Sequence, residues 1–137
     1  MSIKIYSGDS SSSSKIIYTI KDGRIYSGDS TSSSKILFTC YNNHIYDKDS
    51  KSSSKILFTI KNGNVYEGDS SSYSKILYKY TNDKIFEGDS SNSSKIKLTF
   101  KNNNFYKGDS TNSSKIVANV EGFLNEEEFV GIFLAIL

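Results

Sequence analysis

The sequence predicts an all-β protein, a twelve-stranded antiparallel up-and-down barrel closed around a hydrophobic C-terminal helix. Three observations predict this fold. A twenty-residue unit that starts at Ile5 occurs six times without an insertion. Each unit contains two strand patterns, and a turn dipeptide connects the second strand of one unit to the first strand of the next. The last nine residues, 129–137, include no polar side chain. We therefore interpret residues 1–137 as a single domain, in which 1–120 form six β-hairpin repeats and 121–137 form a linker and the helix.

Each hairpin has a longer strand that follows a serine-rich loop, a short turn, and a second strand. Residues 15–20 and 24–28 show this pattern in the first complete hairpin. The dipeptides between the two strands tolerate the positive φ angles that a two-residue type I′ turn requires. These dipeptides are Asp22-Gly23, Asn42-Asn43, Asn62-Gly63, Asn82-Asp83 and Asn102-Asn103. The sequence therefore predicts an antiparallel meander in which short turns alternate with serine-rich loops.

Alternation along the strands assigns one face of the sheet to the core. A two-residue turn places Ile20 opposite Ile25, and the same face then carries Ile16 and Tyr18. These positions are apolar in the repeats, and every equivalent of Ile16 is isoleucine. Cys40 falls on this face as a small core residue. We expect this face to lie inside the barrel.

Residues 126–137 are predicted to form a helix that is apolar on all sides. Asn125 is a favoured N-cap residue, and the glutamates at 126–128 complement the positive end of the helix dipole. Such a helix needs cover on every side. Twelve strands about 4.8 Å apart enclose a barrel of roughly 10 Å radius, which accommodates a helix about 10–12 Å across. The structural core residues expected on the helix are Phe129, Ile132, Phe133 and Ile136.

Two other architectures arrange the same repeats: an open stack of hairpins and a β-solenoid, each capped by the helix. Twenty-residue hairpin stacks of the choline-binding type depend on tryptophan, which this sequence lacks. The type I′ dipeptides count against a solenoid. With its twelve strands, its closure and the apolar segment 129–137, the predicted barrel resembles the tubby-like barrel, which also encloses a hydrophobic C-terminal helix. This resemblance is one of architecture, and it implies binding of phosphoinositides or proteins.

Charged residues gather at the two rims of the predicted barrel. The rim with the short turns has an excess of basic residues and is a candidate anion-binding rim. Its members are Lys21, Arg24, Lys61, Lys84 and Lys101. Because the last strand ends at this rim, we expect the acidic first turn of the helix to meet these cations. At the other rim, we expect the aspartate of each serine-rich loop to pair with the lysine that precedes the next strand, as Asp9 would with Lys15.

The outward face carries an aromatic belt, for which two interpretations are open: cross-strand packing that stabilises the sheet without a partner, and an exposed contact surface. Its members are Tyr6, Tyr26, Tyr46, Tyr66, Phe86 and Tyr106. A mixed position on the same face is occupied by Ile17, Leu37, Leu57, Leu77, Lys97 and Val117. Departures from the repeat mark the residues that can recognise an asymmetric partner, and they concentrate in the third and fourth copies. The candidate partner-binding residues are Tyr41, His44, Tyr46, Asp47, Lys48, Lys51, Tyr66 and Tyr73.

Composition and motifs argue against catalysis and against several ligand classes. The 17 basic and 15 acidic residues leave a net charge of +2, so we expect no nucleic-acid partner. No catalytic motif surrounds His44, and one aspartate per loop does not supply the converging oxygens of a calcium site. We therefore expect no enzyme, no catalytic residues, no metal and no cofactor. The nine apolar residues are too few to cross a bilayer and the N-terminus shows no signal sequence, which predicts a cytoplasmic protein without a transmembrane segment.

The sequence thus predicts a small non-catalytic binding protein that contacts another protein through its outer surface or a rim. One alternative is an inhibitor or immunity protein, of bacterial or phage origin, that blocks an enzyme. Another is a lipid-headgroup or glycan-binding module, with weak binding of an anionic headgroup at the basic rim.

Overall fold

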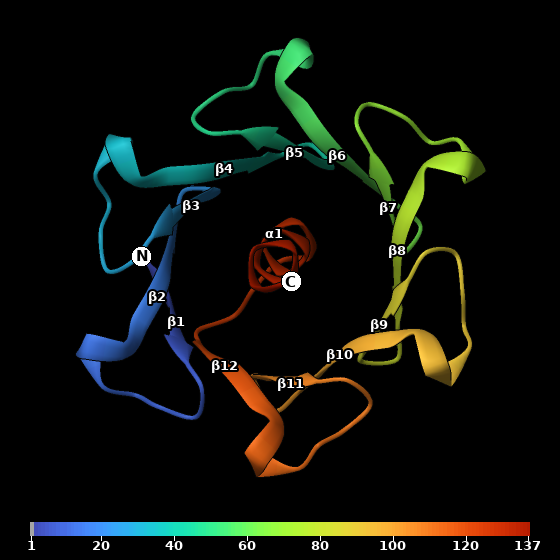
Figure 1. Cartoon of the computed structure of the whole chain (residues 1–137). Coiled ribbons are helices and arrows are strands. Elements are labelled where there is room, and N and C mark those ends of the chain that lie inside the picture. Colours follow the sequence, from blue (N-terminus) through green and yellow to red (C-terminus); the bar gives the residue numbers. More distant parts are fainter. Residues whose placement is uncertain (1) are drawn as a thin grey trace.

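A computed structural model, which describes residues 2–137, shows a closed antiparallel barrel with one helix inside it (Figure 1). The predicted fold class is confirmed, and the open stack and the solenoid are excluded. The longer strands all begin at the isoleucine of a Ser-Lys-Ile sequence: β2 (Ile16–Lys21), β4 (Ile36–Tyr41), β6 (Ile56–Lys61), β8 (Ile76–Thr81), β10 (Ile96–Lys101) and β12 (Ile116–Glu121). The shorter strands are β1 (Ile3–Ser7), β3 (Arg24–Ser27), β5 (His44–Asp47), β7 (Asn64–Glu67), β9 (Lys84–Glu87) and β11 (Asn104–Lys107).

Two kinds of connection alternate around the barrel. The short turns adopt positive φ at both central residues, as at Asp22 (53°) and Gly23 (77°), which confirms the predicted type I′ geometry. The serine-rich loops project outward and form the six lobes of Figure 1. We number them outer loops 1 to 6, and they comprise residues 8–15, 28–35, 48–55, 68–75, 88–95 and 108–115. Each ends in one turn of 3₁₀ helix: η1 (Ser13–Lys15), η2 (Ser33–Lys35), η3 (Ser53–Lys55), η4 (Tyr73–Lys75), η5 (Ser93–Lys95) and η6 (Ser113–Lys115).

Pairing of the first and last strands closes the barrel. Ile5 of β1 lies opposite Val120 of β12, so neither strand leaves an open edge. Asn119 stands on this seam where most other repeats have threonine. Its side-chain amide donates hydrogen bonds to the carbonyl oxygens of Gly8 and Ser10 in outer loop 1. The seam is therefore held by the pairing of β1 with β12 and by side-chain hydrogen bonds to outer loop 1.

A β-bulge in every repeat overturns one part of the predicted face assignment. Ile5 pairs with Tyr18 but Tyr6 pairs with Ile16, so Ile17 is the extra residue, and the same shift recurs in all six copies. Ile16 therefore shares the outward face with Tyr6, and its predicted place in the core is wrong. Ile17 and its equivalent Val117 instead pack against the core, although alternation placed them outside.

Ion pairs between repeats hold the outer loops against the barrel. Lys4 Nζ lies 2.7 Å from Asp29 Oδ1, and Arg24 Nε lies 2.7 Å from Asp49 Oδ1. The two partners are 25 residues apart in each case, so the aspartate reaches back across an intervening long strand. Thr39, on the strand crossed by Asp49, donates its hydroxyl to the carbonyl of Lys48 at 2.7 Å. The first residues of each loop consequently lie over the outer face of the sheet.

The predicted pairing within each loop, such as Asp9 with Lys15, is wrong. No ion pair of this type forms anywhere in residues 2–137, because the aspartates turn toward the preceding repeat. At one of the two repeats that have asparagine in place of this cation, a lysine on a neighbouring strand takes its place. Asn64 replaces the cation that would face Asp89, and Lys79 on the adjacent strand lies 3.9 Å from that carboxylate instead.

The aromatic belt is buried, so its interpretation as an exposed contact surface is wrong and the packing interpretation holds. Its members are between 5% and 8% exposed: Tyr6, Tyr26, Tyr46, Tyr66, Phe86 and Tyr106. Each ring lies against the isoleucine that follows the next outer loop, as Tyr26 does against Ile36. The loops fold over this outer layer, since their aspartates are anchored to the preceding repeat. The barrel wall thus has a second apolar layer outside the sheet.

The helix α1 (Glu126–Ile136) occupies the interior of the barrel, as predicted (Figure 1). Asn125 caps it in a complete capping box, because its side chain accepts from the Glu128 amide and Glu128 accepts from the Asn125 amide. Ile132 and Phe133 are 0% exposed. Phe129 and Ile136 are half-buried at the two ends and pack against the same core, so the predicted core positions of the helix are confirmed.

The backbone of α1 packs closest to β3, β4 and β5. Gly131 permits this approach, since a Cβ atom there would lie 2.5 Å from Ile25 Cδ1 and 3.2 Å from Cys40 Sγ. The wider gap at β8, β10 and β11 is filled by aromatic rings. Phe129 and Phe133 make edge contacts with the rings of β8 and β10, and Phe129 stacks on the ring of β11. The barrel therefore accommodates an off-centre helix by placing small side chains on one wall and large ones on the other.

Candidate interaction surface

Tyr41 and Lys51, two of the predicted partner-binding residues, come together at the rim with the short turns. Tyr41 ends β4 and is 50% exposed, and Lys51 in outer loop 3 places its Nζ 4.2 Å from the centroid of the tyrosine ring. A cation–π contact at an exposed site contributes about 0.5–1 kcal/mol. No other repeat contains this pair, because the equivalents of Tyr41 are Lys21, Lys61, Thr81, Lys101 and Glu121.

Lys48 occupies a strained backbone position. Its φ is 53°, in the left-handed region, where the other five repeats have glycine. Its amide donates to the Leu37 carbonyl at 3.0 Å, just as the Gly28 amide donates to Ile17, so the backbone takes this conformation whichever residue is present. A left-handed conformation costs a residue with a Cβ atom roughly 1–2 kcal/mol. This cost arises in the third repeat only, because the other five repeats have glycine at this position.

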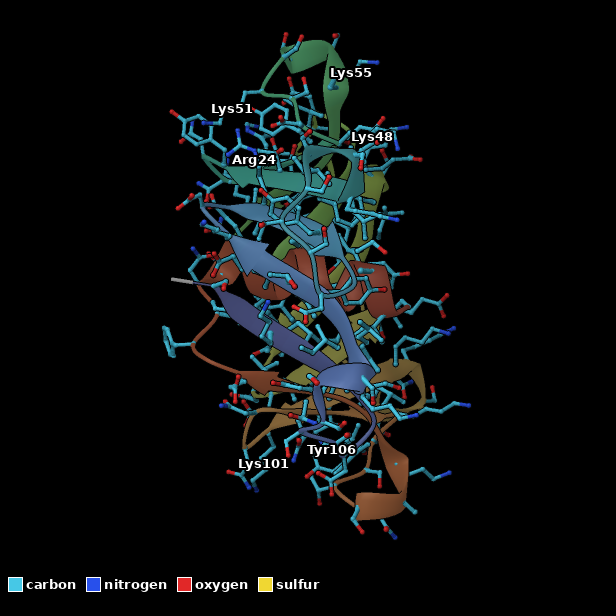
Figure 2. The ribbon with its side chains drawn as sticks, turned by 90° about the vertical axis from the view of Figure 1, so that its left-hand side faces the viewer. Arg24, Lys48, Lys51, Lys55, Lys101 and Tyr106 are labelled. Atoms are coloured by element: carbon cyan, nitrogen blue, oxygen red, sulfur yellow. The ribbon has the colours of Figure 1, made fainter. Side chains whose placement is uncertain are left out.

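Outer loop 3 carries a local excess of positive charge. It holds Lys48, Lys51 and Lys55 against one aspartate, whereas every other outer loop holds one lysine and one aspartate. Asp49, the single carboxylate of the loop, is already engaged by Arg24. Figure 2 shows the three lysines and Arg24 at one end of the molecule, far from Lys101 at the other end. The loop therefore offers three cations without carboxylate partners among residues 2–137.

The remaining predicted partner-binding residues do not join this cluster. Tyr46 and Tyr66 belong to the buried belt and offer no surface. His44 takes the role that Arg24 has in its own repeat, with Nε2 3.4 Å from Asp69 Oδ1 and its ring edge against Tyr46. Tyr73 is 82% exposed but stands in the next outer loop. Asp47 ends β5 at the opposite rim from Tyr41.

The candidate anion-binding rim is partly neutralised. Arg24 and Lys84 are each bound to an aspartate of the following repeat. The other three members, Lys21, Lys61 and Lys101, are exposed and stand on alternate hairpins around a circular rim. Because they are spread around the ring, these three charges do not converge on one anion.

The acidic start of α1 contacts the rim through neutral groups. Glu127 accepts from the backbone amide of Asn43, and Glu126 accepts from the Tyr80 hydroxyl. Burial and this hydrogen bond raise the pKa of Tyr80. Within residues 2–137 the glutamates form no ion pair with the rim lysines, so the expected pairing is wrong. The turn amides and the tyrosine lie nearer the axis than the outward-facing lysines.

Phe123 is an exposed apolar residue that sequence reasoning missed. It is 89% exposed in the linker between β12 and α1. It borders two apolar pockets at this rim, one of about 260 Å³ that includes Leu124 and Phe129, and one of about 390 Å³ against Ile3. The signal in the sequence was an adjacent Phe-Leu pair in a linker, where polar residues are usual.

The single thiol is sequestered in the core. Cys40 is 7% exposed and faces α1, and burial raises the pKa of its thiol to about 12, with smaller contributions from Glu128 and Glu127. A buried protonated thiol is neither a nucleophile nor a ready metal ligand at neutral pH. Among residues 2–137, no three His, Cys, Asp or Glu side chains are grouped so that they could hold a metal ion.

In the described part of the chain, no helix combines the length and the apolarity that a membrane span requires.

We expect the free energy of unfolding to fall as the pH rises above 9. The Cys40 pKa is 9.0 in its unperturbed state and about 12 in the folded chain, so the stabilisation from the protonated thiol is complete below pH 9 and is lost as the pH approaches 12. The loss should be about 1.4 kcal/mol per pH unit within this window. Urea unfolding of the wild type and Cys40→Ala at a series of pH values measures it.

The Cys40→Ala variant should show a shallower decline than the wild type. A remaining decline above pH 10 is expected, because burial also raises the pKa of Tyr18 and of Tyr80. Equal slopes in the two proteins between pH 9 and 10 would contradict the assignment to Cys40.

The six hairpin units and their closure into one ring bear on the family of the protein. A model of the 6-fold beta flower protein family matches residues 2–78 and 65–127. The chain belongs to the beta flower family. The six outer loops of Figure 1 agree with the six-fold arrangement in the family description. Comparison with curated proteins and with solved structures finds no match. The tubby-like resemblance is therefore not confirmed by any match, and it stays a likeness of architecture.

Proposed function

We propose that this beta flower protein is a non-catalytic binding module that contacts another protein through outer loop 3 and Tyr41. The observation that carries the proposal is Lys48, a lysine at a left-handed φ of 53° where glycine stands in every other repeat. Backbone strain that a simple substitution would relieve is typical of residues kept for function. The neighbouring lysine, Lys51, is also a departure from the repeat and contacts the exposed ring of Tyr41.

The chemistry of this surface favours a partner with an acidic patch. Tyr41 supplies a rigid aromatic surface, and tyrosine is enriched among the residues that dominate binding energy in interfaces. Lys48, Lys51 and Lys55 surround it with positive charge, which speeds association with an acidic surface and makes binding sensitive to salt. Blocking an enzyme is one form that such binding can take, and the activity of a captured partner, with and without the protein, tests it.

The repeat provides a direct test, because the third copy can be converted to the consensus of the others. The triple variant Tyr41→Lys, Lys48→Gly, Lys51→Ser introduces residues that already stand at the equivalent positions. It should bind a captured partner at least tenfold more weakly, since interface hot spots contribute about 2 kcal/mol or more each. It should also unfold at higher denaturant concentration, because Lys48→Gly alone relieves roughly 1–2 kcal/mol of backbone strain. Partner affinity by calorimetry and urea unfolding of the same samples measure both effects.

A matched control removes one positive charge elsewhere, because the triple variant removes two lysines and adds one. The variant Lys15→Ser changes outer loop 1, so it has the same net loss of one positive charge without touching outer loop 3. It should bind the partner as the wild type does. If the control weakens binding and the triple variant does not, the contact surface lies elsewhere on the molecule.

A further inference from the structure

A pocket of about 430 Å³ lies at the mouth of the barrel opposite the short turns, where α1 ends. Its volume falls within the range of about 300–1,000 Å³ that is usual for small-molecule sites. The lining is mostly apolar, with two lysines beside it. The residues that define it come from β10, β11, β12 and the end of the helix: Lys97, Leu98, Lys107, Val117, Ile136 and Leu137.

The pocket opens where the inner wall has its smallest side chains. At the position of Tyr18 the first four repeats carry Tyr or Phe, whereas the last two carry Leu98 and Ala118. The helix also packs toward β3–β5 on the opposite wall, as its glycine at 131 allows. Phe105 fills the space deeper in the barrel, where it contacts Phe100 and Phe129. Among residues 2–137, no aromatic side chain borders the pocket at the mouth itself.

Two cations replace apolar or acidic residues at this pocket. Lys97 is the only polar residue at the bulge position, where the other repeats have isoleucine, leucine or valine. Lys107 lies directly opposite Leu98, and its equivalents in the three preceding repeats are Asp47, Glu67 and Glu87. Within residues 2–137 neither lysine has a carboxylate within 4 Å. Like charges on one pocket that form no ion pair favour an anion between them.

We propose that this pocket binds an amphiphile with one alkyl chain and an anionic head group, the chain against the apolar wall and the head between Lys97 and Lys107. The apolar lining excludes a purely polar anion, and the two ammonium groups favour a negative head over a neutral or positive one. The end of α1 contributes about half a negative charge and the terminal carboxylate of Leu137 about one more, which the two full positive charges together exceed. This site is separate from outer loop 3, so it does not depend on the function proposed above.

The alternative explanation for the lysines is structural: cations near the C-terminal end of a helix stabilise it. The two explanations predict different outcomes for Lys97→Leu, a substitution that introduces the residue found at this position in other repeats. Leucine stands at the equivalent of Lys97 in three repeats, so Lys97→Leu should fold and should fill the pocket. A structural role predicts a lower melting temperature for this variant, whereas a ligand site predicts lost binding with an unchanged or higher melting temperature.

Titration of the full chain with decanoate and with decyl phosphate, followed by calorimetry or by amide chemical shifts, tests the proposal and identifies the preferred head group. One of the two should saturate at one equivalent, with affinity rising about fourfold per added methylene. Lys97→Leu should weaken binding at least tenfold. Lys107→Ser, the residue found in the first two repeats, should weaken binding of the anion but leave that of decan-1-ol unchanged.

The matched control is Lys95→Ser, which removes a lysine two residues from Lys97 that does not line the pocket. It should bind like the wild type. The proposal is overturned if neither anion saturates, if decyltrimethylammonium binds as tightly as decanoate, or if Lys97→Leu binds as well as Lys95→Ser.

Discussion

Replacing Phe133 by aspartate is expected to leave the chain unfolded in the absence of denaturant. Phe133 is 0% exposed, and it packs edge-on against Tyr78, Tyr80 and Phe129. Loss of a buried phenylalanine side chain costs about 3–5 kcal/mol, and an unpaired buried carboxylate costs several more. Small domains are stable by only about 5–15 kcal/mol, so the combined cost equals or exceeds the whole stability. Circular dichroism and the dispersion of amide resonances measure the result.

The matched control is the same substitution at an exposed site. Phe123→Asp also exchanges phenylalanine for aspartate, but its ring is 89% exposed. This variant should melt within a few degrees of the wild type. If the Phe133→Asp protein melts like the Phe123→Asp protein, the tail is not the core of the barrel.

Truncation after Asn125 is expected to abolish the cooperative unfolding transition. The shortened chain keeps every strand, but it loses the helix on which the inner faces of those strands pack. The exposed apolar interior would hold water or collapse, and a sheet that lacks specific packing has the properties of a molten globule. We expect aggregation on size-exclusion chromatography, binding of a hydrophobic dye, and a broad thermal transition without a heat-capacity peak.

Truncation after Ile136 provides the control for the longer deletion. It removes only Leu137, which is 44% exposed and lies outside α1. The protein of 136 residues should remain monomeric and cooperative. A monomeric, cooperative chain ending at Asn125 would show instead that the sheet stabilises itself without the helix.

Local chemistry in the sequence was sufficient to predict the elements and their order. The Asn-Gly and Asn-Asn type dipeptides specify type I′ turns, because they tolerate positive φ at both central positions. Asn125 and the glutamates after it predicted the start of the helix, and the capping box confirms it. The apolar segment 129–137 predicted the occupant of the barrel, since a helix without a polar face has no stable position at a surface. The departures in the third repeat predicted Tyr41, Lys48 and Lys51 as candidate contact residues, and their role in binding stays a prediction.

The sequence alone thus determined the strands, the turns and the helix, because each depends on a local pattern of residues. It favoured the closed ring over the open stack and the solenoid, and the pairing of β1 with β12 in the structure decided between them. Only the tertiary structure decided which side chains face outward and which reach the surface. The bulge at Ile17 reverses the side of Ile16, and it arises from the pairing of two strands across an outer loop. The ion pair of Arg24 with Asp49 joins residues 25 apart and folds a loop over the tyrosines, which buries them. Alternation within a strand carries no information on either effect, since both depend on how neighbouring repeats meet in space.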